Sequence, residues 1–318
     1  MKVCVTGAAG FVGSHLSESL VRDGHEVVGL DSFVPYYDRS LKERNLSHWL
    51  EAAPRFTLAE VDLRDGNLDA VLDGVEGIVH AAAMPGLAKS WSQFQLYQDC
   101  NLLGTQRLLD AAHRAGVGRF VQISTSSVYG LDATGDESVP VLPVSPYGVT
   151  KLAAEQLALA FHRTHDLPVT VLRLFSVYGP RQRPDMAYNI FTDAVTSGRP
   201  VVVHGDGLQS RSNTYIDDAV SAISAALALG PAGEIFNIGG GKLITLLEAL
   251  SIIGEHAGVT PEITWAPKRP GDQRSTSAVV DKARELLGYN PSVEPYDGLK
   301  RQVEWQLEER YSMSSAGV

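Results

Sequence analysis

Thr6-Gly7-Ala8-Ala9-Gly10-Phe11-Val12-Gly13 joins the first apolar, β-branched run of the chain to its first amphipathic stretch. The run before it, Val3–Thr6, predicts a strand, and Gly13–Asp23 after it predicts a helix. Glycines between a strand and a helix let the backbone approach a pyrophosphate, which the free N–H groups of the helix N-terminus can bind. The alternative is a glycine-rich turn without a ligand. The position of the motif between a predicted strand and a predicted helix argues against that alternative. The loop residues expected to hold a dinucleotide are Gly7, Gly10, Phe11, Val12 and Gly13.

The same alternation continues through the first half of the chain. Short β-branched runs are followed by longer helical stretches, which implies parallel strands with helices on both faces of the sheet. We therefore expect an α/β fold with a Rossmann-type, doubly wound parallel sheet. The further expected strands are Glu26–Leu30, Gly77–His80, Phe120–Ser124 and Val169–Phe175, and the expected helices include Tyr97–Arg114 and Pro146–His165.

The character of the sequence changes near Ser176. Proline, glycine and arginine cluster in Tyr178–Pro184, and shorter elements follow. We expect residues 1–175 to form the dinucleotide-binding domain. Residues 176–318 should form a smaller C-terminal α/β domain that binds the substrate, with some segments packing on the first domain. This second domain would cover the carboxyl ends of the strands, where the ligands of such sheets bind.

Asp31 stands at the end of the second expected strand. A carboxylate there accepts hydrogen bonds from an adenosine ribose and repels a 2′-phosphate, so it favours NAD over NADP. The alternative is an aspartate that only caps the following turn. Further residues expected beside the cofactor are Asp62 and Leu63, near the adenine, and Ala81 and Ala82, after the strand that ends at His80.

Ser145-Pro146-Tyr147-Gly148-Val149-Thr150-Lys151 begins the longest expected helix, with serine suited to the N-cap and proline to the first helical position. Tyr147 and Lys151 are four residues apart and therefore share one helix face. A free tyrosine has a pKa of about 10 and is a poor base at neutral pH. A nearby ammonium, the helix N-terminus and a cationic nicotinamide would each stabilise the phenolate. Tyr147 could then take a hydroxyl proton while hydride leaves the same carbon for NAD. The alternative is a surface pair without function.

Hydroxyl groups follow another expected strand, in Ser124-Thr125-Ser126-Ser127-Val128-Tyr129-Gly130. Side chains at the carboxyl end of a parallel strand face the ligand crevice. Thr125, Ser126 and Ser127 are therefore expected to hold the reacting hydroxyl and its neighbours. A plain serine and threonine turn is the alternative.

Composition excludes several classes of function. The 318 residues include 27 basic and 37 acidic side chains, and the net charge of −10 argues against a nucleic-acid surface. Two cysteines and nine histidines show no metal-ligand spacing, so we expect no metal site. No apolar stretch is long enough to span a bilayer or to form a signal peptide. We expect a cytoplasmic, reduced protein without membrane partners.

Together these motifs resemble the extended short-chain dehydrogenase/reductase family, and specifically its NAD-dependent nucleotide-sugar epimerases and dehydratases. The resemblance covers nearly the whole chain and is closest to the UDP-glucuronate 4-epimerases. At the positions of Thr125-Ser126-Ser127, the resemblance implies Thr-Asp-Glu in members that dehydrate and Thr-Ser-Glu in members that decarboxylate. The absence of a carboxyl group there favours epimerisation. The other matching segments are Val177–Asp185, His204–Gly207, Ser210–Asp218 and Arg269–Asp272.

The resemblance implies roles for individual residues. Tyr147 would deprotonate the C4 hydroxyl with Thr125 as hydrogen-bond partner, and the 4-keto sugar would turn over before hydride returns. Ser126, Ser127 and Ser176 would hold the sugar carboxylate. Arg211 and Arg269 would clamp the diphosphate, Arg183 would lie near the sugar or diphosphate, and His204 would pack on uracil. A solvated surface position is the alternative for each arginine.

Two departures from the family pattern put the C6 group of the sugar in question. Ala88 stands where the uronate epimerases have arginine, with Lys89 adjacent, and Arg211-Ser212-Asn213 replaces arginine-aspartate-phenylalanine. The remaining alternatives are a UDP-glucose or UDP-N-acetylglucosamine 4-epimerase, a nucleotide-sugar reductase with net redox change, and a non-catalytic NAD-sensing scaffold. The family also implies a homodimer formed through two helices per subunit, here Tyr97–Arg114 and Pro146–His165, with Leu108, Leu109, Leu152 and Leu157 on their apolar faces.

Overall fold

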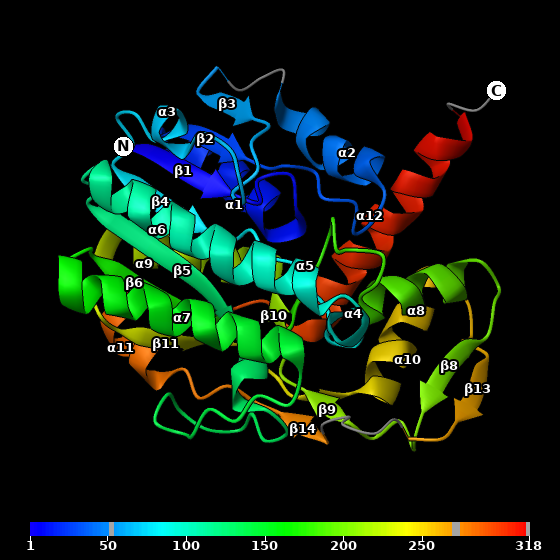
Figure 1. Cartoon of the computed structure of the whole chain (residues 1–318). Coiled ribbons are helices and arrows are strands. Elements are labelled where there is room, and N and C mark those ends of the chain that lie inside the picture. The colour runs from blue at the N-terminus through cyan, green and yellow to red at the C-terminus, as the bar shows by residue number, and fades with distance from the viewer. Residues whose placement is uncertain (51–53, 269–273, 316–318) are drawn as a thin grey trace.

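A parallel sheet forms the centre of the molecule (Figure 1), in a computed structural model that describes residues 1–50, 54–268 and 274–315. Within these residues the main sheet has seven strands in the order β11-β6-β5-β4-β1-β2-β3, and every pair is parallel. The order reverses direction at β1, as in a doubly wound sheet, so the predicted fold class is confirmed. The strands are β1 Lys2–Thr6, β2 Glu26–Leu30, β3 Phe56–Ala59, β4 Gly77–His80, β5 Arg119–Thr125, β6 Val169–Leu174 and β11 Ile235–Ile238.

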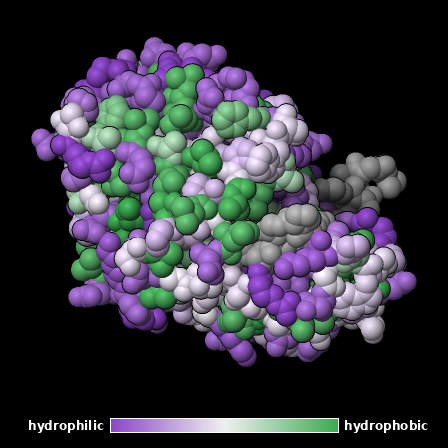
Figure 2. All heavy atoms as spheres, turned by 60° about the horizontal axis from the view of Figure 1, so that its bottom comes forward, coloured by the Kyte–Doolittle hydropathy of each residue, from purple (hydrophilic) through white to green (hydrophobic). Residues whose placement is uncertain are grey.

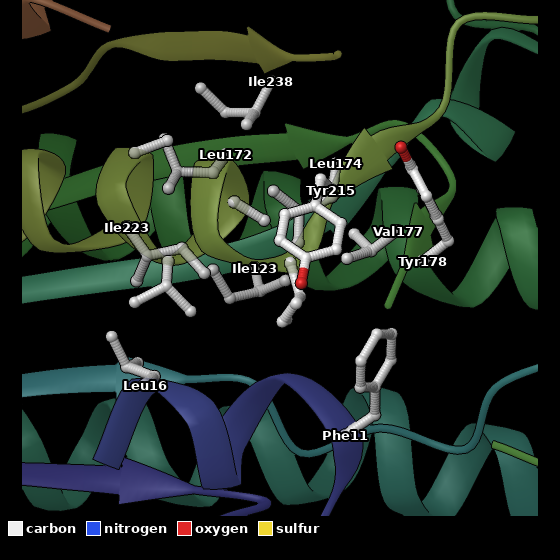
Figure 3. Close-up of a cluster of buried hydrophobic side chains, with 14 of the residues drawn as sticks. Phe11, Leu16, Ile123, Leu172, Leu174, Val177, Tyr178, Tyr215, Ile223 and Ile238 are labelled. Atoms are coloured by element: carbon white, nitrogen blue, oxygen red, sulfur yellow. The ribbon is translucent and has the colours of Figure 1, made fainter. Parts of the chain in front are cut away.

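The side chains of the central strands are apolar on both faces of the sheet, so both faces must be covered, and helices cover them. Val3 and Val5 of β1 lie in the same hydrophobic cluster as Leu16 of α1 and Ile223 of α9. Cys4, between them, lies in the cluster that packs under α6 and α7. Figure 3 shows the first of these clusters, in which Leu16 and Ile223 point toward each other from their two helices. The helices of this part are α1 Phe11–Arg22, α2 Arg39–Leu50, α3 Leu68–Val71, α4 Leu87–Ser92, α5 Phe94–Gln98, α6 Gly104–Arg114, α7 Pro146–His165 and α9 Ile216–Leu229.

The remaining elements form a smaller layer at the carboxyl ends of the strands. Helices α8, α10 and α12 pack on one another beside three small sheets (Figure 1). These elements are α8 Ala187–Thr196, α10 Leu246–Ala257, α12 Pro295–Ser315, β7 Val177–Tyr178, β8 Val201–His204, β9 Ser210–Arg211, β10 Thr214–Tyr215, β12 Ile244–Thr245, β13 Ile263–Ala266 and β14 Ser275–Thr276. Helix α11, Asp281–Leu287, packs instead on α9 and β11 of the main sheet. Because β11 pairs with β6 and α9 packs on α1, part of the chain after Ser176 belongs to the main sheet.

Most of the predicted elements are found within one or two residues of their expected bounds. The helix expected over Tyr97–Arg114 is instead composed of α5, a π-helix at Asp99–Leu103 and α6. Leu108 and Leu109, expected on an exposed apolar face, are fully buried against the sheet. Their expected part in a subunit interface is therefore wrong.

Candidate active site

A cavity of about 440 Å³ runs along the carboxyl ends of the main-sheet strands. It brings together residues from widely separated segments of the sequence. The predicted residues that line it are Gly7, Gly10, Phe11, Val12, Gly13, Asp31, Asp62, Leu63, Ala81, Ala82, Thr125, Ser126, Ser127, Tyr147, Lys151, Ser176 and Arg183. Among the described lining residues, four side chains are cationic and two are anionic, although the whole chain carries a net charge of −10. The cavity therefore offers a local positive field of the kind that diphosphates bind.

The glycine loop needs its glycines for steric reasons. Gly7 has φ +72°, a conformation that glycine adopts without strain. A Cβ on Gly13 would lie 2.0 Å from the carbonyl oxygen of Gly7. Gly10 is the N-cap of α1, and no side chain of the described residues caps that helix end. The N-terminal amides of α1 therefore remain available to an anion at the cavity wall.

Asp31 directly follows β2, and its side chain is buried beside the glycine loop. Its Oδ1 accepts from the Phe33 amide at 2.8 Å and from Lys42 Nζ at 3.1 Å, and its Oδ2 accepts from the Ala9 amide at 3.2 Å. Asp31 thus caps the following turn and also lines the cavity, so the two readings of this residue are compatible. Lys42, from α2, is a lining residue that the sequence did not indicate.

Tyr147 and Thr125 meet where α7 begins and β5 ends. Ser145 caps α7 by accepting from the Gly148 amide at 3.1 Å, and Pro146 occupies the first turn, as predicted. Burial raises the pKa of the Tyr147 phenol, while a side-chain hydrogen bond with Thr125 and the charge of Arg183 act in the opposite direction. Arg183 therefore supplies a cation to the phenol in addition to the ammonium, the helix N-terminus and the nicotinamide that were predicted to stabilise it.

Lys151 lies one helical turn after Tyr147 and is almost fully buried. Its Nζ donates to the carbonyl oxygen of Ile123 at 2.7 Å. Burial lowers the pKa of Lys151 to about 8, and the negative charge of Glu155 opposes that change. The side chain is therefore predominantly an ammonium at neutral pH, as the proposed chemistry requires.

Two of the predicted substrate residues lie outside this cavity. His204 and Arg211 are not among the residues that line the cavity. His204 Nδ1 is 3.0 Å from the carbonyl oxygen of Pro267, and Arg211 Nη1 donates to the carbonyl oxygen of Ser210 at 2.8 Å. Arg269 lies outside the described residues. The expected contacts of these three residues with uracil and diphosphate stay predictions.

The segment that departs from the family pattern lies at the rim of the cavity. Gly86 and Leu87 line it, whereas Lys89 does not. Lys89 Nζ is instead 4.1 Å from the centre of the Tyr36 ring, and the Tyr36 hydroxyl donates to Asp185 Oδ2 at 3.2 Å. Tyr36 itself lines the cavity, so Lys89 acts on the site through this tyrosine rather than by reaching into it.

The described part of the chain has neither a metal-ligand cluster nor a membrane-spanning helix. No three histidine, cysteine, aspartate or glutamate side chains are placed to hold a metal ion there. Nor does any helix in these residues combine the length and apolar character needed to cross a bilayer.

The fold and this cavity define a dinucleotide-dependent enzyme of the doubly wound class, and the predicted tyrosine and lysine line its cavity. Residues 3–239 match the NAD dependent epimerase/dehydratase family, and the chain belongs to that family. The chain is 41% identical over 307 residues to the uncharacterized UDP-glucose epimerase YtcB of Bacillus subtilis, covering 95% of this chain and 97% of that protein. It is 36% identical to a dTDP-glucose 4,6-dehydratase of an Actinoplanes species, covering 96% and 97%.

Solved structures give the same assignment. The UDP-glucuronic acid 4-epimerase of Bacillus cereus, in complex with UDP-glucuronic acid and NAD, superposes with a TM-score of 0.93 at 38% identity. The match covers 97% of this chain and all of that one. Relatives with different reactions thus share this fold, so the reaction must be argued from the residues in the cavity.

Proposed function

We propose that this protein is an NAD-dependent UDP-glucuronate 4-epimerase that interconverts UDP-glucuronate and UDP-galacturonate through a 4-keto intermediate. One observation carries the proposal. Thr125, Tyr147 and Lys151 share one cavity with the glycine loop, and the two residues after Thr125 are serines rather than carboxylic acids. A dehydratase needs an additional acid and base beside the sugar, whereas an epimerase needs only one group that moves a proton.

Tyr147 is the group that moves the proton. Its phenolate, stabilised by Lys151, Arg183 and the hydrogen bond with Thr125, accepts the proton of the C4 hydroxyl. Bound NAD would supply the hydride acceptor for C4 and the hydride donor for the opposite face of the same carbon. Tyr147 then gives its proton back to the C4 oxygen. Both half-reactions occur at one carbon, so no net redox change results.

The residues around the cavity suit this cofactor. The uncapped start of α1 and the glycine loop fit a pyrophosphate, and the buried Asp31 carboxylate fits a ribose diol. We assign the cofactor to the residues of 1–175 and the sugar nucleotide mainly to those of 176–318. Asp62, Leu63, Ala81 and Ala82 complete the cofactor wall.

The C6 carboxylate must be held away from the geometry that releases carbon dioxide, because a 4-keto uronate is a β-keto acid. Ser126, Ser127 and Ser176 line the cavity and supply hydroxyl donors. Arg183 supplies the positive charge, and its guanidinium is already oriented by Asp185, whose two oxygens accept from Nε and Nη2 at 3.0 and 3.1 Å.

The test is to incubate the purified protein with UDP-glucuronate, with and without added NAD, and to follow the sugar by proton NMR. UDP-galacturonate without loss of carbon dioxide and without net NADH supports the proposal. Tyr147→Phe should lower turnover by a factor of at least about 100 while NAD stays bound. The exposed Tyr296 provides the matched control, since Tyr296→Phe should leave turnover unchanged. Full activity of Tyr147→Phe would refute the mechanism.

A neutral-sugar 4-epimerase is the second candidate. The observation in its favour is Ala88, which places no cation at the position where the uronate epimerases have arginine. Comparing kcat/KM for UDP-glucuronate, UDP-glucose and UDP-N-acetylglucosamine decides between them. A preference for a neutral sugar would move the assignment to this candidate.

We also propose a homodimer, working in a reducing compartment such as the cytoplasm. Exposed apolar side chains gather on α4, α5, the π-helix and α7, and they include Leu87, Trp91, Phe94, Leu103 and Val149. Figure 2 shows hydrophobic side chains gathered around the middle of the face that is turned forward there. Light scattering of Trp91→Glu against the unmodified protein tests the dimer, and a monomer in both would contradict it. Cys4 and Cys100 are unpaired thiols, as a reducing compartment allows.

A further inference from the structure

A fully buried carboxylate lies behind the catalytic pair, outside the cavity. Glu155 is four residues after Lys151 on α7 and has no exposed surface. Its Oε2 accepts from Ser124 Oγ at 2.9 Å and from Arg173 Nε at 3.1 Å, and its Oε1 accepts from Arg173 Nη2 at 2.5 Å. Glu155 is not among the residues that line the cavity, so it is not positioned to touch substrate or cofactor.

The partners of Glu155 connect it to both halves of the catalytic site. Ser124 immediately precedes Thr125 at the end of β5, and Arg173 pairs with Ser124 in the register of β5 and β6. Arg173 Nη1 donates to the Tyr129 hydroxyl at 2.8 Å, and that hydroxyl donates to Asn237 Oδ1 of β11 at 2.7 Å. One carboxylate therefore fixes α7 to the ends of β5 and β6, where Thr125 and Tyr147 meet.

The charges around Lys151 make this carboxylate more than a structural tie. Lys151 and Arg173 are both buried cations. Without a negative charge beside them, two such cations in a low-dielectric interior would disfavour the charged form of the lysine. His80 of β4, the other titratable group that interacts with Lys151, stays neutral because burial lowers its pKa to about 3. Tyr147 on α7, Tyr97 of α5, Tyr129 and Arg183 are further titratable or charged side chains near these two residues.

We propose that Glu155 is a positioning residue that keeps Lys151 cationic in its buried site and holds the end of β5 so that Thr125 faces Tyr147. The inference rests on the proposed function, since it concerns the same catalytic pair. Burial lowers the pKa of Lys151 to about 8, and Glu155 is the charge that limits this change. Loss of the Lys151 proton then sets the alkaline limit of activity, and removing Glu155 moves that limit toward neutral pH.

The test is the pH profile of kcat for Glu155→Gln, which keeps the shape and one acceptor of the side chain but removes its charge. We expect the alkaline limb to move down by about one pH unit, with KM for the sugar nucleotide little changed. Glu155→Asp keeps the charge and should retain most of the wild-type profile. Tyr129→Phe is the matched control, because it removes a partner of Arg173 without changing any charge. It should lower the melting temperature and leave the profile in place.

A purely structural role gives a different result. If Glu155→Gln lowers the melting temperature as Tyr129→Phe does and its pH profile does not move, the proposal is overturned. If Glu155→Gln does not fold, Glu155→Asp decides, since a displaced profile in a variant that keeps the charge would contradict the proposal. The pH dependence of NAD binding, with Lys151→Met as reference, gives the same comparison without any sugar. This readout still tests Glu155 if the protein turns over no UDP-sugar, an outcome that would refute only the proposed function.

Discussion

His80 should make the protein lose stability in mild acid, and the size of the loss follows from its contacts. The side chain is 1% exposed, between the glycine loop and α6. Thr105 Oγ1 donates to the carbonyl oxygen of Asn101 at 2.7 Å, so it must accept from His80 Nε2 at 2.9 Å. His80 Nδ1 then accepts from Thr6 Oγ1 at 2.8 Å. Both nitrogens of the neutral imidazole therefore have partners, and a proton added to Nδ1 would face the Thr6 hydroxyl donor.

The sign of the pH effect follows from linkage. Burial lowers the pKa of His80 to about 3 in the folded state, against about 6.5 for an unfolded histidine. Between these values the unfolded state binds more protons, so stability is lost as the pH falls through this window. At pH 5 the difference from 6.5 amounts to about 2 kcal/mol.

Urea unfolding at pH 7.5 and pH 5 measures this effect. For His80→Gln, which keeps one donor and one acceptor, the loss of unfolding free energy between the two pH values should be smaller than in the unmodified protein by about 2 kcal/mol. His113, exposed at the end of α6, gives the control variant His113→Gln, whose loss should match that of the unmodified protein. An equal loss in all three proteins would show that His80 is not held neutral.

Three further predictions concern the cavity wall. Gly13→Ala should abolish NAD binding and lower the melting temperature, because the added Cβ would lie 2.0 Å from the Gly7 carbonyl oxygen. Gly241→Ala is the control and should do neither, because a Cβ there meets nothing within 4 Å. Calorimetry with NAD checks both variants. Asp31→Asn should raise the affinity for NADP relative to NAD by about tenfold, since Lys42 then loses its carboxylate partner, and an unchanged ratio would argue against the ribose contact. Arg183→Lys should raise KM for UDP-glucuronate by about tenfold more than KM for UDP-glucose if the guanidinium N–H groups not used by Asp185 bind the carboxylate, and steady-state kinetics with both sugars decide.

Local sequence patterns were sufficient for the parts of the site that lie within one strand-to-helix junction. The glycine loop, the Ser145 cap and the spacing of Tyr147 and Lys151 each depend on residues close together in the chain, so propensity and periodicity predict them. Lys42 could not be found this way, because its contact with Asp31 depends on where α2 packs. The effect of Arg183 on Tyr147 is likewise long-range, since it joins the start of α7 to the segment before α8.

The errors have the same origin. Leu108 and Leu109 form an apolar pair on a helix, and the sequence does not say whether a sheet or a second subunit covers it. In the structure the sheet covers both residues. The pairing of β11 with β6 was also beyond the local pattern, because residues 175–234 separate the two strands. The Glu155–Arg173 pair is the clearest omission, and only the i, i+4 spacing of Lys151 and Glu155 could have indicated it.

The acids that line the cavity argue for epimerisation over the other reactions of the family. Within the described lining residues the carboxylates are Asp31 and Asp62, and both are already engaged. Asp31 holds Lys42 and two backbone amides, and Asp62 binds Arg64 at 2.7 Å, which holds the pKa of Asp62 below its ordinary value. Both carboxylates therefore already have partners within the protein, and both follow strands on the side of the glycine loop away from α7. Tyr147 is then the group beside Thr125 that can carry a proton. A single proton carrier supports oxidation and re-reduction of one sugar carbon, but it does not support the removal of water from the neighbouring carbons.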